Sequence, residues 1–184
     1  MEAWWCEALW LQFGAAIDML DNALVACPES LWRQRLWPGP SDNPLPPGGA
    51  EFWYVAYHAL FWLDLYLSGS AEGFAPPAPF GLEELDPAGV VPARPFTGEE
   101  LRTYVAFARQ KCRSTVASLT DEQARRVVDI PWAKRRAFSY LELQLYNMRR
   151  VQEHAAQLSL ALGQHGIDAA PSWVGRATSD PAHP

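Results

Sequence analysis

The stretch of residues 52–67 constrains the fold most, because it is apolar at nearly every position. A helix that is apolar on most sides must be surrounded by other apolar elements. The stretch is slightly short for a bilayer span, and it contains His58 and Asp64. We therefore expect a helix buried among other helices, with insertion into a membrane as the alternative.

Three further segments, which begin near residues 2, 97 and 139, have apolar residues at steps of three and four, which is helical spacing. A Ser or Thr followed three residues later by Glu or Gln is a capping box, and this pattern occurs at Thr97, Thr120 and Ser139. The sequence predicts long helices over about 2–27, 50–68, from 97, and from 139 to 163 or 166. It also predicts a short helix after Thr120 that Pro131 interrupts, and no strand is strongly indicated.

Two connectors rich in Pro and Gly separate these helices, at residues 28–49 and 69–96. The second is long enough to cross a whole bundle, so the helices that it joins are able to run parallel. We expect an all-α four-helix bundle over residues 1–166. The remaining residues, 167–184, should form a tail that is partly docked or disordered, with Trp173 as the docking residue.

Composition excludes several classes of protein. With 49% apolar residues the chain can bury a sizeable core, and with a formal charge of −6 and no long basic run it makes a poor partner for nucleic acid. The cysteines Cys6, Cys27 and Cys112 are far apart and form no CxxC pair, which indicates reduced thiols. The first residues do not form a secretion signal. We expect a cytoplasmic protein.

Polar residues at the edge of the core indicate where chemistry could occur. Asn147, Arg150 and His154 share one flank of the last helix, because they are spaced by three and four residues. His58 is nearly alone among apolar residues, and Glu51 lies on about the same face. If these two helices face each other, the two imidazoles could meet and bind a divalent ion, although a metal site usually has three protein ligands. A hydrogen-bonded core histidine is the alternative.

At these residues the chain resembles the DinB-like superfamily, which includes thiol-dependent transferases and isomerases. The resemblance lies in residues 57–64 (YHALFWLD), 92–101 (PARPFTGEEL) and most of all 147–158 (NMRRVQEHAAQL), and with the helix order it covers about 2–166. It implies an up-down-down-up bundle with a long crossover between the second and third long helices. It also implies a homodimer and a divalent metal ion (Zn, Ni or Mn) held by three histidines.

His58 and His154 match the first and last histidines of that triad, but Arg150 stands at the middle position. A guanidinium has no lone pair to give and repels a divalent ion, so the standard triad cannot form. Three interpretations follow. Another ligand (Glu51, Asn147 or Gln12) completes a modified site, or the metal is lost and Arg150 binds a carboxylate or an anionic ligand, or the cleft is structural.

These interpretations lead to three hypotheses of function. The first is a metal-dependent thiol transferase or hydrolase, with Trp53, Trp62 and Tyr146 around an apolar substrate. The second is a metal-free pocket in which Arg150 binds a small anionic molecule and His58, Asn147 and His154 supply hydrogen bonds. The candidate ligand-binding or supporting residues are Arg150, Asn147, Glu51 and Trp62. The third is a structural protein whose aromatic surfaces form a dimer.

Overall fold

The computed structural model describes residues 4–37, 49–128, 130, 137–169 and 171–177. Its four long helices are α1 (Trp4–Ala26), α3 (Phe52–Ser68), α4 (Gly98–Ala117) and α6 (Tyr140–Gln164). Short elements lie between them: α2 (Glu29–Trp32), the 3-10 helix η1 (Glu83–Leu85), α5 (Asp121–Arg125), β1 (Val127–Val128) and β2 (Phe138–Ser139). The chain is therefore all-α, apart from one two-stranded sheet.

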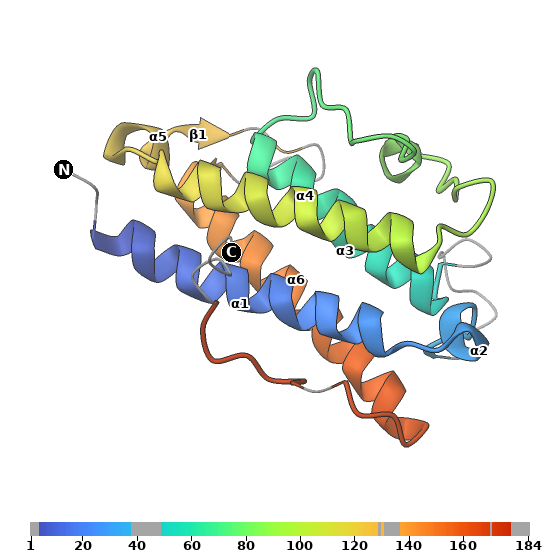
Figure 1. Ribbon diagram of the computed structural model, residues 1–184. Coiled ribbons are helices and arrows are strands. Elements are labelled where there is room, and N and C mark those ends of the chain that lie inside the picture. The colour runs from blue at the N-terminus through green and yellow to red at the C-terminus, as the bar shows by residue number, and fades with distance from the viewer. Residues whose placement is uncertain (1–3, 38–48, 129, 131–136, 170, 178–184) are drawn as a thin grey trace.

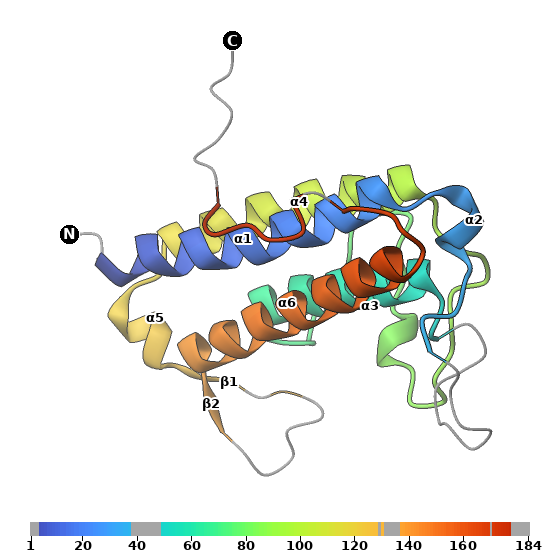
Figure 2. The ribbon, with the colours of Figure 1, turned by 90° about the horizontal axis from the view of Figure 1, so that it is seen from below.

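The long helices form a four-helix bundle in which α1 and α3 each pack against α4 and α6. In Figures 1 and 2, α1 and α6 run in one direction, and α3 and α4 run in the other. This is the up-down-down-up order that the family resemblance implies. Because α3 and α4 are parallel, the connector between them must return along the bundle, and η1 lies within that connector.

Helix α3 is the most deeply buried of the four. Of its described residues, His58, Trp62 and Ser68 alone are outside the buried core. The helix ends at Gly69, whose φ of +71° is a left-handed conformation that favours glycine. Within the described part of the chain, no helix is both long enough and apolar enough to span a membrane.

The helix starts follow the capping signals. Thr97 and Thr120 each form a complete capping box, with Glu100 and Gln123 respectively. The Ser139 hydroxyl accepts a hydrogen bond from the backbone N–H of Glu142 and so caps α6. The helix starts were predictable because these bonds join residues only three apart in the chain.

One small sheet was not predicted. Strands β1 and β2 pair antiparallel, with Val127 opposite Ser139 and Val128 opposite Phe138. Two residues are too few to show the alternation that indicates a strand, so the sequence carries no signal for this pair. The predicted interruption at Pro131 lies outside the described residues.

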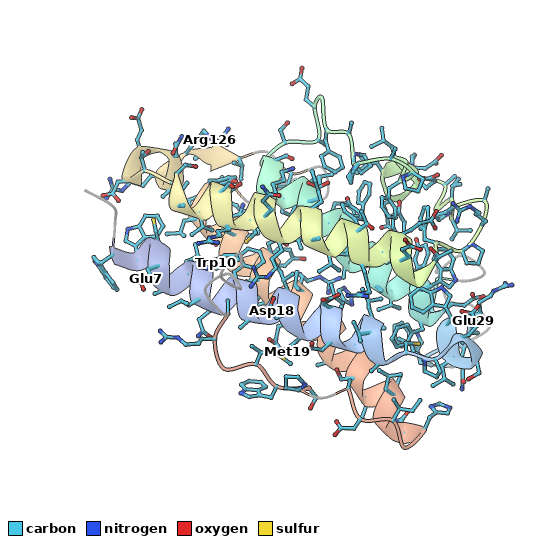
Figure 3. All side chains as sticks on the ribbon, viewed as in Figure 1. Glu7, Trp10, Asp18, Met19, Glu29 and Arg126 are labelled. Atoms are coloured by element: carbon cyan, nitrogen blue, oxygen red, sulfur yellow. The ribbon has the colours of Figure 1, made fainter. Side chains whose placement is uncertain are left out.

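Charged and aromatic side chains join α1 to α4 on the surface of the bundle. Arg109 donates from Nε to Asp18 Oδ1 over 2.7 Å, and its guanidinium lies 5.1 Å from the ring centre of Trp10. Trp10 and Asp18 are labelled along α1 in Figure 3. A partly buried pair of this kind helps to fix the register of two neighbouring helices.

The segment after α6 turns back along α1 (Figure 2). Its backbone is bonded to α1: the Ala177 N–H donates to Leu11 O, and the side chain of Gln12 donates to Gly175 O. The prediction that Trp173 docks on the body was wrong, because this side chain is 74% exposed. The tail is attached through its main chain and not through its aromatic residue.

Candidate functional site

Two histidines from facing helices meet on one side of the bundle. His58 comes from α3 and His154 from α6, and their ring centres are 5.2 Å apart with the ring planes at 87°. His154 is buried, whereas the side chain of His58 is 29% exposed. The facing-helix argument from the sequence thus leads to a real contact between the two imidazoles.

Glu84, from η1, holds His58 in place through a hydrogen bond to one of its ring nitrogens. Its Oε2 accepts hydrogen bonds from His58 Nδ1 over 2.7 Å and from Trp62 Nε1 over 2.8 Å. Burial raises the pKa of the Glu84 carboxyl, but the bonds and charge from His58, together with Tyr54 and Trp62, outweigh burial and hold that pKa below its usual value. Glu84 is therefore ionised at neutral pH, and His58 keeps its proton on Nδ1. The other ring nitrogen, Nε2, is then the one able to accept a proton.

His154 is a neutral histidine with an unused acceptor. Its Nδ1 donates to Gln157 Oε1 over 2.9 Å, while its buried Nε2 has no hydrogen-bond partner among the described residues. Burial and the nearby charge of His58 lower the pKa of His154 to about 4. The ring thus presents a lone pair on Nε2 at neutral pH.

Both histidines line one pocket of about 330 Å³. The pocket lies where α3, the connector around η1, and α6 meet the end of the first connector. Its described lining comprises Trp37, Gly49, Tyr54, Val55, His58, Glu83, Glu84, Asp86, Gly89, Val90, Arg150, Glu153, His154 and Gln157. Because the side chain of His58 is partly exposed, the pocket is open to solvent.

Arg150 lies at the edge of the same pocket. Its Nη1 is 2.9 Å from Glu153 Oε2, three residues further along α6, and its side chain is 34% exposed. The guanidinium is therefore already paired with a carboxylate. It adds a fixed positive charge one helical turn before His154.

The other residues named from the sequence have partners elsewhere. The Asn147 amide donates to Leu63 O over 3.1 Å, which fastens α6 to the backbone of α3. Glu51 precedes α3 as its cap residue and accepts a bond from Trp53 Nε1 over 2.7 Å. Gln12 holds the tail. None of these side chains is part of the described lining of the pocket, and Trp62 acts on it through Glu84.

The residues present do not fit a standard metal triad. Two imidazoles on one tetrahedral ion have ring centres about 5 Å apart, a spacing that His58 and His154 have. The position of the third ligand, one helical turn before His154, is occupied by Arg150, which cannot ligate a metal ion. Among the described residues, no group of three or more His, Cys, Asp or Glu side chains is arranged to hold a metal. The donor set is two nitrogens, one short of what such sites use.

No cysteine belongs to this pocket among its described lining residues. Cys6 and Cys112 are buried in the core, and burial raises the pKa of the half-buried Cys27 thiol to about 12. Burial also raises the pKa of Cys112. The thiols of Cys27 and Cys112 are therefore protonated at neutral pH and are poor nucleophiles.

Sequence reasoning missed Glu84, the residue whose hydrogen bond fixes the tautomer of His58. It lies in the connector of Pro and Gly residues, where no helical or strand periodicity relates it to His58. The one available signal was a pair of adjacent carboxylates, Glu83 and Glu84, in the segment that has to pass over the bundle. The aromatic residues of the pocket, Tyr54 and Trp37, also differ from those expected, since Trp53 and Tyr146 are not in its described lining.

The fold and the site define a class: up-down-down-up four-helix bundles with a histidine-lined pocket between the second and last long helices. The family model of the DinB superfamily matches residues 12–158, which is most of the chain. The protein belongs to the DinB superfamily. Comparisons with curated proteins and with solved structures gave no match.

Proposed function

We propose that the protein is a transferase or hydrolase that works without a metal ion, with His58 as a general base that activates a small thiol or water. The observation that carries the proposal is the 2.7 Å hydrogen bond from His58 Nδ1 to the buried Glu84 carboxylate. Such a bond fixes the imidazole in one tautomer and stabilises the imidazolium that forms when Nε2 takes a proton.

His154 supports this role as a neutral neighbour. A second protonated imidazole beside His58 would oppose protonation of His58, and the lowered pKa of His154 removes that opposition at neutral pH. Its unpartnered Nε2 can accept a hydrogen bond from the incoming thiol or water and hold it beside His58.

We assign the role of nucleophile to a molecule from solution. No Ser, Thr, Cys or Lys side chain is among the described residues that line the pocket. A thiol or water bound in the pocket gives its proton to His58 Nε2 as it attacks an electrophilic carbon of the substrate. The bond from that carbon to the leaving group then breaks, and the leaving group departs with the electron pair and takes the proton from His58. The use of a small thiol agrees with the transferases that the family resemblance implies.

A metal-dependent enzyme is the second candidate. The spacing of His58 and His154 and the unpartnered Nε2 of His154 favour it, and Arg150 opposes it. The two candidates differ in one measurable property, which is whether activity survives a chelator. The cytoplasmic location and the homodimer that the resemblance implies stay predictions.

The test is a rate measurement on untagged protein with two reactions: a thiol added to 1-chloro-2,4-dinitrobenzene, and hydrolysis of p-nitrophenyl acetate. We expect activity in the presence of EDTA. His58→Gln should lower kcat/KM about a hundredfold, and Glu84→Gln at least about tenfold. His165→Gln is the matched control, because His165 is exposed and bonds to Gln34 away from the pocket.

Two outcomes would contradict the proposal. Equal rates for His58→Gln and the wild-type protein would exclude His58 as the base. Activity that disappears in EDTA and returns with zinc, nickel or manganese would support the metal-dependent candidate instead.

A further inference from the structure

The described lining of the pocket carries more negative than positive side chains. Glu83, Glu84 and Asp86 form the wall that the connector supplies, and Glu153 stands on α6. Among the described lining residues Arg150 is the one side chain with a permanent positive charge, and it is paired with Glu153. Even with Glu84 left out, because it bonds to His58, Glu83 and Asp86 have no positively charged partner among the described lining residues.

An anionic ligand would therefore meet four described carboxylates and one guanidinium that already has a partner. Electrostatics disfavours such a ligand and favours a cation.

The unsatisfied hydrogen-bonding groups indicate the same kind of ligand. The hydroxyls of Tyr54 and Tyr57 lie near the Glu84 and Glu83 carboxylates, respectively. Among the described residues, the buried atoms Glu83 Oε2, Glu84 Oε1 and His154 Nε2 nevertheless have no well-formed hydrogen bond, and all three residues line the pocket. The Glu84 side chain is 5% exposed, so solvent access is nearly nil there. The Glu84 carboxylate is held ionised and accepts at Oε1, and His154 accepts at Nε2 because its proton is on Nδ1. Buried acceptors are costly unless a donor reaches them, and an ammonium group has three donors and no acceptor.

The rest of the lining suits an apolar body. Trp37, Tyr54, Val55 and Val90 contribute aromatic and aliphatic surface. Aromatic faces also attract cations directly. A volume of about 330 Å³ is at the small end of ligand pockets, which limits the ligand to a small molecule.

We propose that this pocket selects a small primary amine in its ammonium form, with an apolar or aromatic body. The ammonium group lies against the Glu83 and Glu84 carboxylates, and the body lies against Trp37 and Tyr54. This inference rests on the proposed function in one respect: it names the class of substrate for the pocket in which His58 acts.

The experiment compares three ligands that share a phenyl ring and differ in charge: phenethylamine, 2-phenylethanol and 3-phenylpropanoate. Binding to the full chain is measured by titration calorimetry and by ligand-observed NMR at pH 7, so no turnover is needed. We expect phenethylamine to bind saturably and at least tenfold more tightly than the alcohol or the carboxylate. A carboxylate or alcohol that binds as tightly as the amine, or an amine that does not bind, would overturn the proposal.

A matched pair of variants tests the location. Glu83→Gln should weaken phenethylamine binding at least tenfold. Glu72→Gln removes the same charge from an exposed position of the same connector, outside the described lining, and should leave binding unchanged. Equal weakening by both variants would show a general effect of net charge and would overturn the proposed site.

The two proposals fail separately. If the amine binds but no reaction depends on His58, the proposed function is wrong and the pocket is an amine-binding site. If a reaction depends on His58 but the amine series shows no preference for the cation, the substrate class is wrong and the general base stands.

Discussion

Arg150 is the residue on which the metal question depends. It occupies the helical turn before His154 and faces the same pocket, so a ligating side chain at this position would lie beside two imidazoles that are already close together. Arginine cannot ligate, and its charge opposes a divalent ion by Coulomb repulsion. One substitution at this position should therefore be enough to add the third ligand of a metal site.

Arg150→His should create a zinc or nickel site. Histidines at positions i and i+4 of a helix present their rings on one face, and the third nitrogen would come from His58 on α3. We expect about one ion per chain, with affinity at least tenfold above that of the wild-type protein. Calorimetry with Zn²⁺ and Ni²⁺ on untagged protein measures both quantities.

Arg149→His is the matched control. Arg149 directly precedes Arg150 in α6, but it is exposed and lies outside the described pocket lining. It should leave affinity for the metal at the wild-type level. If Arg150→His gains no more affinity than Arg149→His, the two imidazoles do not converge on a common point, and the metal-dependent candidate loses its geometric support.

The residues of the site were predictable only in part. His58, Arg150 and His154 could be named from helical spacing, because their positions follow from two helices that the sequence indicates clearly. Glu84 could not, since a connector without periodicity gives no information on where its side chains lie. Glu51 shares a face with His58 in an ideal helix, but the helix starts after it, and its carboxylate turns to the Trp53 indole.

At the scale of secondary-structure elements, the C-terminal tail depends on one glycine of α1. A Cβ atom built on Gly14 would lie 2.6 Å from the Cβ of Ala177, closer than two carbon atoms can approach. Gly14 thus lets the tail lie directly on the helix. No local sequence pattern predicts this contact, because it joins residues that are far apart in the chain.

Gly14→Ala should release the tail and leave the bundle folded. Alanine favours the interior of α1 by about 0.5–1 kcal/mol, but the clash displaces Ala177 and with it the bond to Leu11 O. We expect trypsin to cleave after Arg176 several-fold faster, measured by mass spectrometry of timed digests.

Gly163→Ala is the control for this substitution, since a Cβ at Gly163 meets nothing within 4 Å. It should change the cleavage after Arg176 little. The same rate of cleavage in Gly14→Ala and Gly163→Ala would mean that the tail is not held by its contact with α1.

At the scale of the whole molecule, one buried cluster joins the two parallel helices. Asp64 is fully buried on α3, and its carboxylate accepts bonds from the Tyr104 hydroxyl and the Lys111 ammonium of α4. Asp64 lies six residues after His58 and so on a different face of α3, because one face of this helix packs on α4 and the other lies on the pocket. The helix order was predictable from the length of the connector, whereas the place of η1 over the pocket was not.

The stability of the whole bundle should depend on pH through His154. An unfolded histidine has a pKa of 6.5, and burial lowers that of His154 to about 4 in the folded protein. Between these two values the unfolded chain binds the proton more tightly, so the free energy of unfolding falls as pH decreases from 6.5 towards 4. The contribution of this one residue is on the order of 3 kcal/mol, complete above pH 6.5 and lost below pH 4.

Urea denaturation at pH 7, 5.5 and 4 measures this effect when the wild-type protein is compared with His154→Gln. Carboxylates that titrate in the same range are common to both proteins, so they cancel in the difference between the two curves. The difference should shrink by roughly 3 kcal/mol from pH 7 to pH 4. His165→Gln, at the exposed histidine that follows the last residue of α6, should give a difference that stays nearly constant. A constant difference for His154→Gln as well would mean that His154 titrates normally, and the neutral neighbour that the general-base proposal needs beside His58 would be absent below pH 6.5.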